Sequence, residues 1–167
     1  EWLGGTRDDA AGECFDKCAR ILGLPYPGGP AIERTAQSVM NDENLVVNKL
    51  PRPMMDQDTY EMSFSGLKSA VVNQFGELSN KNPEKLRETI PYLAKEINEA
   101  VVEVLIEKTM KAVNSYRPKS VLLAGGVAAN VLLRKEFKHA LKTPSAFHAS
   151  PPWLGEIKLY VPEMKYC

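Results

Sequence analysis

Acidic side chains and glycine-containing backbone lie close together near the start of the chain. The segment 8–17, DDAAGECFDK, has the acidic start of a helix, and within a few helical turns it leads into the segment 23–30, GLPYPGGP. A helix that leads into such a loop can hold a carboxylate beside backbone that no Cβ atom covers. This arrangement suits a ligand that is rich in hydroxyl groups and carries phosphate, such as a nucleotide.

A second candidate site lies far downstream. The apolar run VLLA at 121–124 predicts a short buried strand, Gly125 and Gly126 break it, and 127–141 predicts a helix with Asn130 in its first turn. A strand, a glycine turn and a helix N-terminus form a common nucleotide-binding arrangement. Taken alone, the glycine pair can equally be only a tight connection.

The elements that position these groups follow from hydrophobic periodicity and from capping residues. Asp8 or Asp9 is expected to cap a first helix, which ends at about Leu22 because Gly23 follows. Pro91 is expected to begin the longest helix. Further helices are predicted at 31–40, 67–75 and 127–141, strands at 60–64, 121–124 and 158–161, and polar connections at 41–58 and 76–82. Strands that alternate with helices indicate the α/β class.

Five segments of the chain, in their order, resemble one protein family. They are DDAAGE at 8–13, FDK at 15–17, LGLPYPGGP at 22–30, FSGLK at 64–68 and AGGVAAN at 124–130. In these segments the chain resembles the TsaD family (also called Gcp or YgjD), the tRNA threonylcarbamoyladenosine-modification enzymes of bacteria. Their archaeal and eukaryotic counterpart is the catalytic subunit of the KEOPS complex. The resemblance extends from Leu3 to Cys167.

The resemblance implies an RNase H-like lobe of the actin, Hsp70 and sugar-kinase (ASKHA) superfamily, in which the nucleotide lies in a cleft between two lobes. Residues 1–167 would form a single partial domain, most of the C-terminal lobe, with an irregular insertion at 143–156. Family members carry a metal-binding His-x-Glu-Gly-His-type motif upstream and a Thr-Asp-Asn segment downstream, and neither occurs in this sequence. The chain is therefore expected to be an internal piece of a longer enzyme, with no metal ligand of its own.

The resemblance also assigns ligand contacts near the first segment. Asp16 would accept hydrogen bonds from ribose hydroxyl groups, the Gly29 backbone would lie against the ligand, and Glu33 would lie near the ribose. The sequence leaves alternatives open for both carboxylates. Asp16 can instead be solvated or pair with Lys17 or Arg20. Glu33 can equally be a surface residue of a helix.

Three further contacts are implied near the second segment. The Asn130 amide would bind an adenine edge or a phosphate oxygen, while Gly125 and Gly126 would let the backbone approach the ligand closely. The alternative for Asn130 is a hydrogen bond to the backbone of its own helix. No catalytic residue can be assigned within the chain.

Composition limits the remaining possibilities. Lys and Arg number 21, as do Asp and Glu, so the net charge of zero argues against a strong nucleic-acid footprint on this segment alone. The apolar runs are too interrupted for a transmembrane helix. Cys14 and Cys18 lie one helical turn apart, and with Cys167 they form too sparse a set for a disulfide framework. Buried thiols and a cytoplasmic protein are expected.

The implied function is transfer of a threonylcarbamoyl group from threonylcarbamoyl-AMP to N6 of the adenosine beside the tRNA anticodon. The parent enzyme would use a divalent metal, iron or zinc, whose ligands lie outside this chain, so the chain alone is expected to be inactive. Implied partners are tRNA, the smaller homologue TsaB and the ATPase TsaE. The alternatives are an ASKHA-type small-molecule kinase or ATPase that binds ATP or ADP, and a non-catalytic module for nucleotide binding or subunit docking. A glycoprotein endopeptidase has little support, because no protease motif is visible.

Overall fold

The computed structural model describes residues 1–39, 47–81, 83–142 and 157–163. Five α-helices are found in these ranges: α1 Ala11–Ile21, α2 Gly28–Gln37, α3 Ser65–Lys81, α4 Leu86–Tyr116 and α5 Val131–Ala140. The 3-10 helix η1 Gly126–Ala129 precedes α5, and the strands are β1 Ser120–Leu122 and β2 Lys158–Tyr160. The predicted insertion at 143–156 lies outside the described residues.

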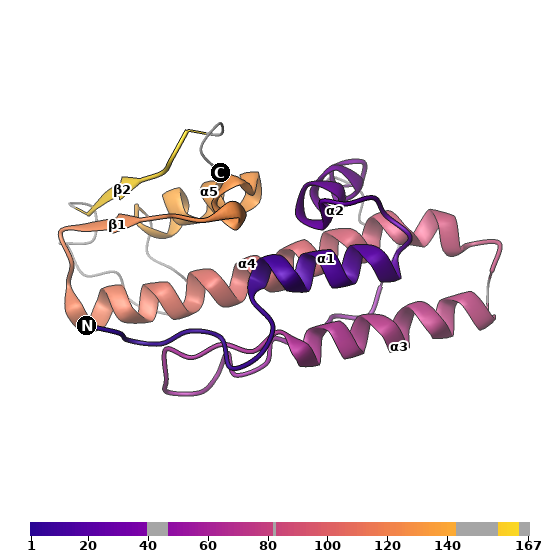
Figure 1. The fold of residues 1–167 in the computed structure, drawn as a ribbon, viewed down its shortest axis with the longest axis horizontal. Helices are drawn as coiled ribbons and strands as arrows, with labels where there is room; N and C mark the ends of the chain where they lie inside the picture. The colour runs from indigo at the N-terminus through magenta and orange to yellow at the C-terminus, as the bar shows by residue number, and fades with distance from the viewer. Residues whose placement is uncertain (40–46, 82, 143–156, 164–167) are drawn as a thin grey trace.

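The long helix α4 is the base on which the other elements pack. It runs along the longest axis of the molecule, with α3 and α1 along one part of it and β1, β2 and α5 near its C-terminal end (Figure 1). Helix α2 packs against both α1 and α4. Among the described residues, no helix is both long enough and apolar enough to cross a bilayer.

The main hydrophobic core lies between α1, α2, α3 and α4. Phe15 on α1, Phe64 before α3 and Ile97 on α4 are each at most 1% exposed and pack in one cluster. Helical spacing predicts an apolar stripe of Ala11, Phe15, Cys18, Ala19 and Leu22 on α1. The last four are buried, and Ala11 packs partly buried against the same core. Each large side chain buried in this way contributes about 1.5–3 kcal/mol relative to exposure.

A second, smaller core supports the sheet. Strands β1 and β2 pair in parallel, with Val121 opposite Leu159, and both face a cluster that includes Leu133 and Phe137 of α5. The strand predicted at 158–161 is confirmed at 158–160. The strand predicted at 121–124 is present as β1 Ser120–Leu122, but the prediction that it is buried is wrong, because Leu122 is 70% exposed. The structure is thus mixed α/β, rich in helix, with one small parallel sheet.

Two helices begin where the sequence did not indicate. Helix α2 starts at Gly28 rather than Ala31, since proline is tolerated in the first turn of a helix and Pro30 therefore lies inside it. Helix α4 starts at Leu86 and continues through Pro91, which was expected to begin it. Apolar packing of the turns that follow Pro91 outweighs the one backbone hydrogen bond that a proline cannot donate.

Two further predictions between the helices are wrong. Residues 60–64 form no strand, and Met62 makes only a single isolated parallel bridge with Thr6. Helix α3 continues past Phe75 to Lys81, over part of the stretch that was predicted as a polar connection. Its added turns are held by an exposed Glu77–Lys81 ion pair one turn apart and by packing of Phe75 against the main core.

Candidate functional site

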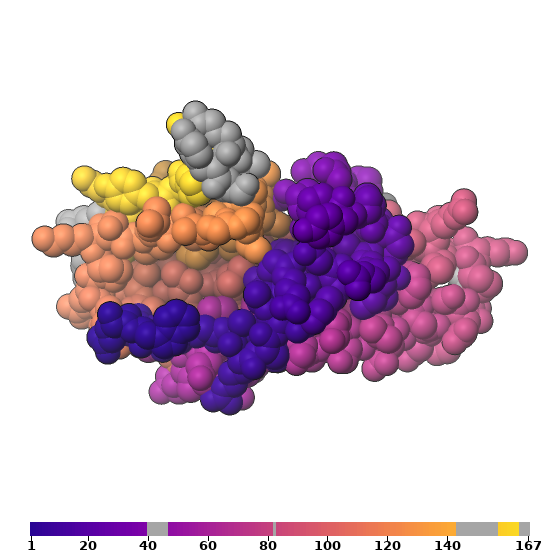
Figure 2. All heavy atoms as spheres, viewed as in Figure 1, coloured from indigo at the N-terminus to yellow at the C-terminus, as the bar shows by residue number. Residues whose placement is uncertain are grey.

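A pocket of about 550 Å³ brings together five of the six residues singled out from the sequence. They are Asp16, Gly29, Glu33, Gly126 and Asn130. One wall comes from α1 and α2, and the other from η1 and Asn130, which directly precedes α5. Figure 2 shows a hollow between the indigo and violet surface of α1 and α2 and the orange surface that contains η1 and α5. Two motifs about a hundred residues apart in sequence thus form one site.

Asp16 is held by backbone rather than by a cation. Its Oδ1 accepts a hydrogen bond of 2.7 Å from the N–H of Gly28, the first residue of α2. Lys17, one of the ion-pair partners considered above, lies instead 2.7 Å from Asp9 and 2.8 Å from Glu13. A carboxylate offers about four lone-pair sites, so Asp16 keeps acceptor capacity beyond this one bond.

The two adjacent glycines at the start of α2 have different surroundings. A Cβ on Gly28 would lie 2.5 Å from Cα of Asp16 and 2.7 Å from the carbonyl oxygen of Phe15, so only glycine lets α2 pass this close to α1. A Cβ on Gly29 would meet only the Phe15 side chain, at 3.9 Å. Gly28 is therefore required for packing, whereas Gly29 presents bare backbone to the pocket.

Glu33 links the two walls of the pocket. Its Oε1 accepts hydrogen bonds from the N–H groups of Val131, at 2.7 Å, and Leu132, at 3.4 Å. These are the first two residues of α5. Glu33 is thus neither a plain surface carboxylate nor free of partners, because it caps a helix from another part of the chain.

Asn130 is the N-cap of α5 and is only 7% exposed. It was predicted in the first turn of a helix over 127–141, but the 3-10 helix η1 ends before it and α5 begins after it. Its Oδ1 accepts from the N–H of Leu133 at 2.9 Å, and its Nδ2 donates to Oδ1 of Asn98 at 2.8 Å. Asn98, a buried residue of α4, gave no signal in the sequence, because it lies within an apolar helix stripe.

The N-terminus of α5 is therefore already satisfied. Glu33 and Asn130 together accept from the N–H groups of its first three residues. Those groups are the ones that bind a phosphate at a helix N-terminus. The predicted strand, glycine turn and helix are present, but a phosphate at this helix end would first have to displace the Glu33 carboxylate.

Gly125 and Gly126 lie at the start of the second wall of the pocket, the one that contains η1. Gly125 has a φ of +84° and precedes η1, a conformation that favours glycine. Gly126 lines the pocket, whereas Gly125 does not. A Cβ on either residue would meet no atom within 4 Å, so there is open space beside both.

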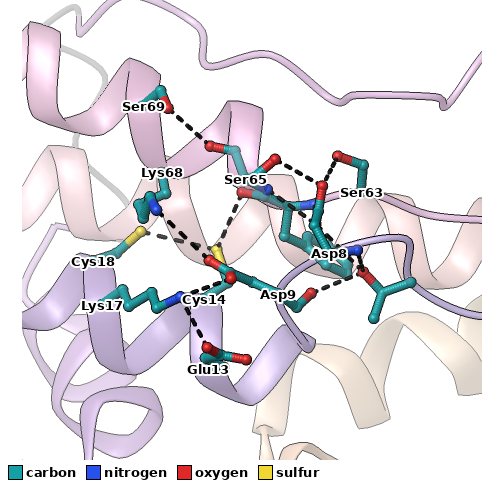
Figure 3. Close-up of polar contacts among 12 residues, drawn as sticks. Asp8, Asp9, Glu13, Cys14, Lys17, Cys18, Ser63, Ser65, Lys68 and Ser69 are labelled. Atoms are coloured by element: carbon teal, nitrogen blue, oxygen red, sulfur yellow. Dashed lines mark hydrogen bonds and ion pairs between the residues drawn. The ribbon is translucent and has the colours of Figure 1, made fainter.

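Asp8 connects the first motif to α3 rather than capping α1. Its carboxylate accepts from the backbone N–H groups of Phe64, at 2.8 Å, and Ser65, at 3.2 Å, and from the hydroxyls of Ser63 and Ser65 (Figure 3). Desolvation by neighbouring atoms opposes ionisation of Asp8, but these bonds outweigh it and hold the pKa of Asp8 well below its usual range. The N-cap of α1 is Ala10, which makes no side-chain capping bond, so the predicted cap is wrong.

Asp9 makes a second connection between the segment at 8–17 and α3. It lies 2.7 Å from Lys17 Nζ, and its other oxygen is 3.9 Å from Nζ of Lys68 on α3 (Figure 3). The hydrogen bonds that Lys17 donates to Asp9 and then to Glu13 raise the pKa of Lys17 above its usual value. Ser65 and Lys68, which had no assigned role, thus join FSGLK to DDAAGE.

The cysteines of α1 are buried, as predicted. The Sγ atoms of Cys14 and Cys18 are 3.9 Å apart, and Cys14 also lies 3.9 Å from the carbonyl oxygen of Phe64. The contact with Cys18 and then burial raise the pKa of the Cys14 thiol, which disfavours the thiolate needed for nucleophilic or metal chemistry. In the ranges that the structure describes, no group of three His, Cys, Asp or Glu side chains is placed to hold a metal ion.

Known proteins match this chain over its whole length. The family model described as "TsaD: tRNA N6-adenosine threonylcarbamoyltransferase" matches residues 1–167. A protein of that name from Moorella thermoacetica is 49% identical over 138 residues, which are 83% of this chain and 38% of the relative. Relatives of the same name from Syntrophomonas wolfei and Thermosipho africanus are each 42% identical over 167 residues, 100% of this chain and 44% of theirs. The chain thus spans about two fifths of the length of these relatives.

Proposed function

Because the chain belongs to the TsaD family of tRNA N6-adenosine threonylcarbamoyltransferases, we propose that its parent protein acts in threonylcarbamoyladenosine biosynthesis. The reaction joins N6 of the adenosine next to the tRNA anticodon to the carbamoyl carbon of threonylcarbamoyl-AMP. A C–N bond forms, the bond from that carbon to the AMP phosphate oxygen breaks, N6 loses a proton, and AMP leaves. The residues of this chain hold the adenylate half of the donor.

The pocket carries this proposal, because its lining suits a nucleoside. Two carboxylates, Asp16 and Glu33, are acceptors for ribose hydroxyls, and apolar side chains such as Pro30 and Val127 offer a surface for a base. None of the described residues that line the pocket is Lys or Arg. Its volume of about 550 Å³ falls within the range of roughly 300–1,000 Å³ that is usual for small-molecule sites.

The phosphate and the reacting carbonyl are assigned to a different place. The α5 N-terminus is occupied by Glu33 and Asn130, and the described residues offer no suitable metal ligands. The donor is therefore proposed to extend from the pocket toward a part of the parent protein outside this chain, where iron or zinc is bound. A metal there would polarise the carbamoyl carbonyl.

The wider setting follows from the family. The fold is proposed to be most of the C-terminal lobe of a two-lobed ASKHA-type protein. The proposed partners are tRNA, TsaB and TsaE, and the proposed location is the cytoplasm. The alternative of a small-molecule kinase or ATPase needs cations around the transferred phosphate, and the described lining of this pocket does not supply them.

The test is transfer of the threonylcarbamoyl group to tRNA by the full-length protein. The product is measured as threonylcarbamoyladenosine after the tRNA is digested with nuclease. Asp16→Asn keeps an oxygen for the Gly28 N–H but weakens acceptance from ribose, so the KM for threonylcarbamoyl-AMP is expected to rise about tenfold, the equivalent of about 1.4 kcal/mol. Asp16→Asn combined with Asn130→Ala is expected to lower kcat/KM further. Glu61→Gln, in an exposed ion pair with Arg7, is the matched control.

Two results would contradict the proposal. One is normal modification of tRNA, with an unchanged KM, by the Asp16→Asn and Asn130→Ala double variant. The other is a phosphorylated small molecule formed from ATP without tRNA, which would favour the kinase alternative.

A further inference from the structure

We propose that Asn98 is a positioning residue, which fixes the orientation of the Asn130 amide and so determines what Asn130 presents to the pocket. Asn98 itself is not among the residues that line the pocket, so it acts through Asn130. Its effect on the ligand rests on the proposed function. Its effect on the Asn130 side chain does not.

The surroundings of Asn98 make its hydrogen bond necessary. Asn98 is 6% exposed on α4, and its helix neighbours Ala94, Ile97 and Val101 are fully buried. A buried amide without a partner costs about 1–3 kcal/mol, whereas an apolar residue at this position would carry no such cost. The bond of 2.8 Å from Asn130 Nδ2 to Asn98 Oδ1 provides that partner.

The Asn130 amide is held at both ends. Its Oδ1 accepts from the N–H of Leu133, and its Nδ2 donates to Asn98. Turning the amide by half a rotation would place NH₂ against the Leu133 N–H and oxygen against the Asn98 oxygen, so both contacts would become repulsive. The N-cap bond alone fixes one end, and Asn98 fixes the other.

This arrangement limits what Asn130 can offer a ligand. One Nδ2 proton goes to Asn98, so the second proton is the donor that remains, with the unused lone pair of Oδ1 as the acceptor. Without Asn98, the amide would be held by the N-cap bond alone and would vary more in orientation. A ligand would then have to order the side chain on binding, which weakens affinity.

The experiment compares three variants of the full-length protein. Asn98→Leu is similar in size but removes the acceptor, whereas Asn98→Asp keeps an oxygen for Asn130. Thr89→Val is the matched control, since Thr89 is also buried on α4 but its hydroxyl donates to the backbone carbonyl oxygen of Lys85, the N-cap of that helix. The probe is adenosine, because its neutrality avoids any repulsion from the added Asp.

The first measurement needs no ligand. The side-chain NH₂ signals of Asn130 in a ¹H–¹⁵N spectrum, assigned by their loss in Asn130→Asp, report its hydrogen bonding. In Asn98→Leu they are expected to move toward the positions of a solvated amide and to exchange faster with water. They should stay in place in Asn98→Asp and in Thr89→Val. Unchanged signals in Asn98→Leu would overturn the proposal.

The second measurement is the dissociation constant for adenosine. It is expected to rise about five- to tenfold in Asn98→Leu and to return to within about twofold of the parent value in Asn98→Asp, as for loss and recovery of one oriented hydrogen bond. Shifted signals with an unchanged dissociation constant would overturn the role toward the ligand. If the unaltered protein binds no adenosine, the proposed function fails, while the NH₂ signals still decide whether Asn98 orients Asn130.

Discussion

Replacing Asp8 with Ala is expected to destabilise the protein through α3, although Asp8 lies before α1 in the sequence. The variant removes an acceptor from the backbone N–H groups of Phe64 and Ser65 and from the hydroxyls of Ser63 and Ser65. The N–H of Ser65 begins α3, so Asp8 acts as a cap contributed by a distant segment. Loss of such a cap uncovers donors at a helix end that faces the main core.

The magnitude follows from the kind of contact. Replacing a capping side chain with Ala costs about 0.5–2 kcal/mol, and the two hydroxyl bonds favour the upper half of that range. Asp8 is exposed, so water replaces part of what is lost, and we expect about 1.5 kcal/mol. This corresponds to a fall of about 3–6 °C in the midpoint of thermal unfolding. Asp8→Asn keeps Oδ1 for the two N–H groups and should cost about 0.5 kcal/mol.

The effect of Asp8→Ala also depends on pH. The pKa of Asp8 in the folded chain lies below the ordinary value of 3.8, so the unfolded chain takes up the proton first as the pH falls. The stabilisation is therefore fully present above about pH 4 and is lost progressively below it. The stability difference between the unaltered protein and Asp8→Ala should shrink in acid.

The assay is thermal unfolding of the unaltered protein and of Asp8→Ala, at pH 7 and at several pH values below 4. Asp56→Ala, which removes an exposed carboxylate from the loop before α3, is the control and should change the midpoint by less than about 1 °C. An unfolding midpoint of Asp8→Ala equal to that of the unaltered protein at pH 7 would contradict this role of Asp8. A difference in midpoint that grows as the pH falls would contradict it equally.

Four other substitutions test packing and electrostatics, three of them beside the pocket and one at an ion pair with α4 away from it. Gly28→Ala is expected to lower the unfolding midpoint by more than about 5 °C, whereas Gly29→Ala should leave it within about 2 °C, since only the first places a Cβ against backbone. Arg52→Met leaves the nearly buried Glu96 without its cation, and a loss of about 2–4 kcal/mol is expected in urea unfolding; an unchanged midpoint would contradict it. Glu33→Ala frees the N-terminus of α5, so added sulfate should raise the unfolding midpoint of this variant more than that of the unaltered protein.

Local patterns predicted the helices and much of the candidate site. The apolar stripe of α1 and the position of β2 follow from spacing that the chain carries within a few residues. Asp16, Glu33 and Asn130 were found because their motifs are specific, and the structure brings them to one pocket. Whether they contact a nucleotide stays a prediction.

The contacts that the sequence did not predict join distant segments. Asp8 was taken for the cap of α1 because that helix follows it, yet its partners lie more than fifty residues away at Phe64 and Ser65. Asn98 is buried, like its apolar neighbours on α4, so its role is visible only from its hydrogen bond with Asn130. The continuation of α4 through Pro91 also depends on tertiary packing, which local propensity does not include.

The two walls of the pocket belong to different hydrophobic clusters, and both clusters pack on α4 (Figure 1). Phe15 and Ile32 anchor one wall in the main core, while Leu133 anchors the other beside Val102 of the same long helix. Because α4 is one continuous hydrogen-bonded helix, it sets the spacing between the two walls. The hydrogen bond from the Val131 N–H to Glu33 also joins one wall to the other. A ligand that binds in this pocket would meet walls already held apart at a set width, so little of its binding free energy would be used to bring them together.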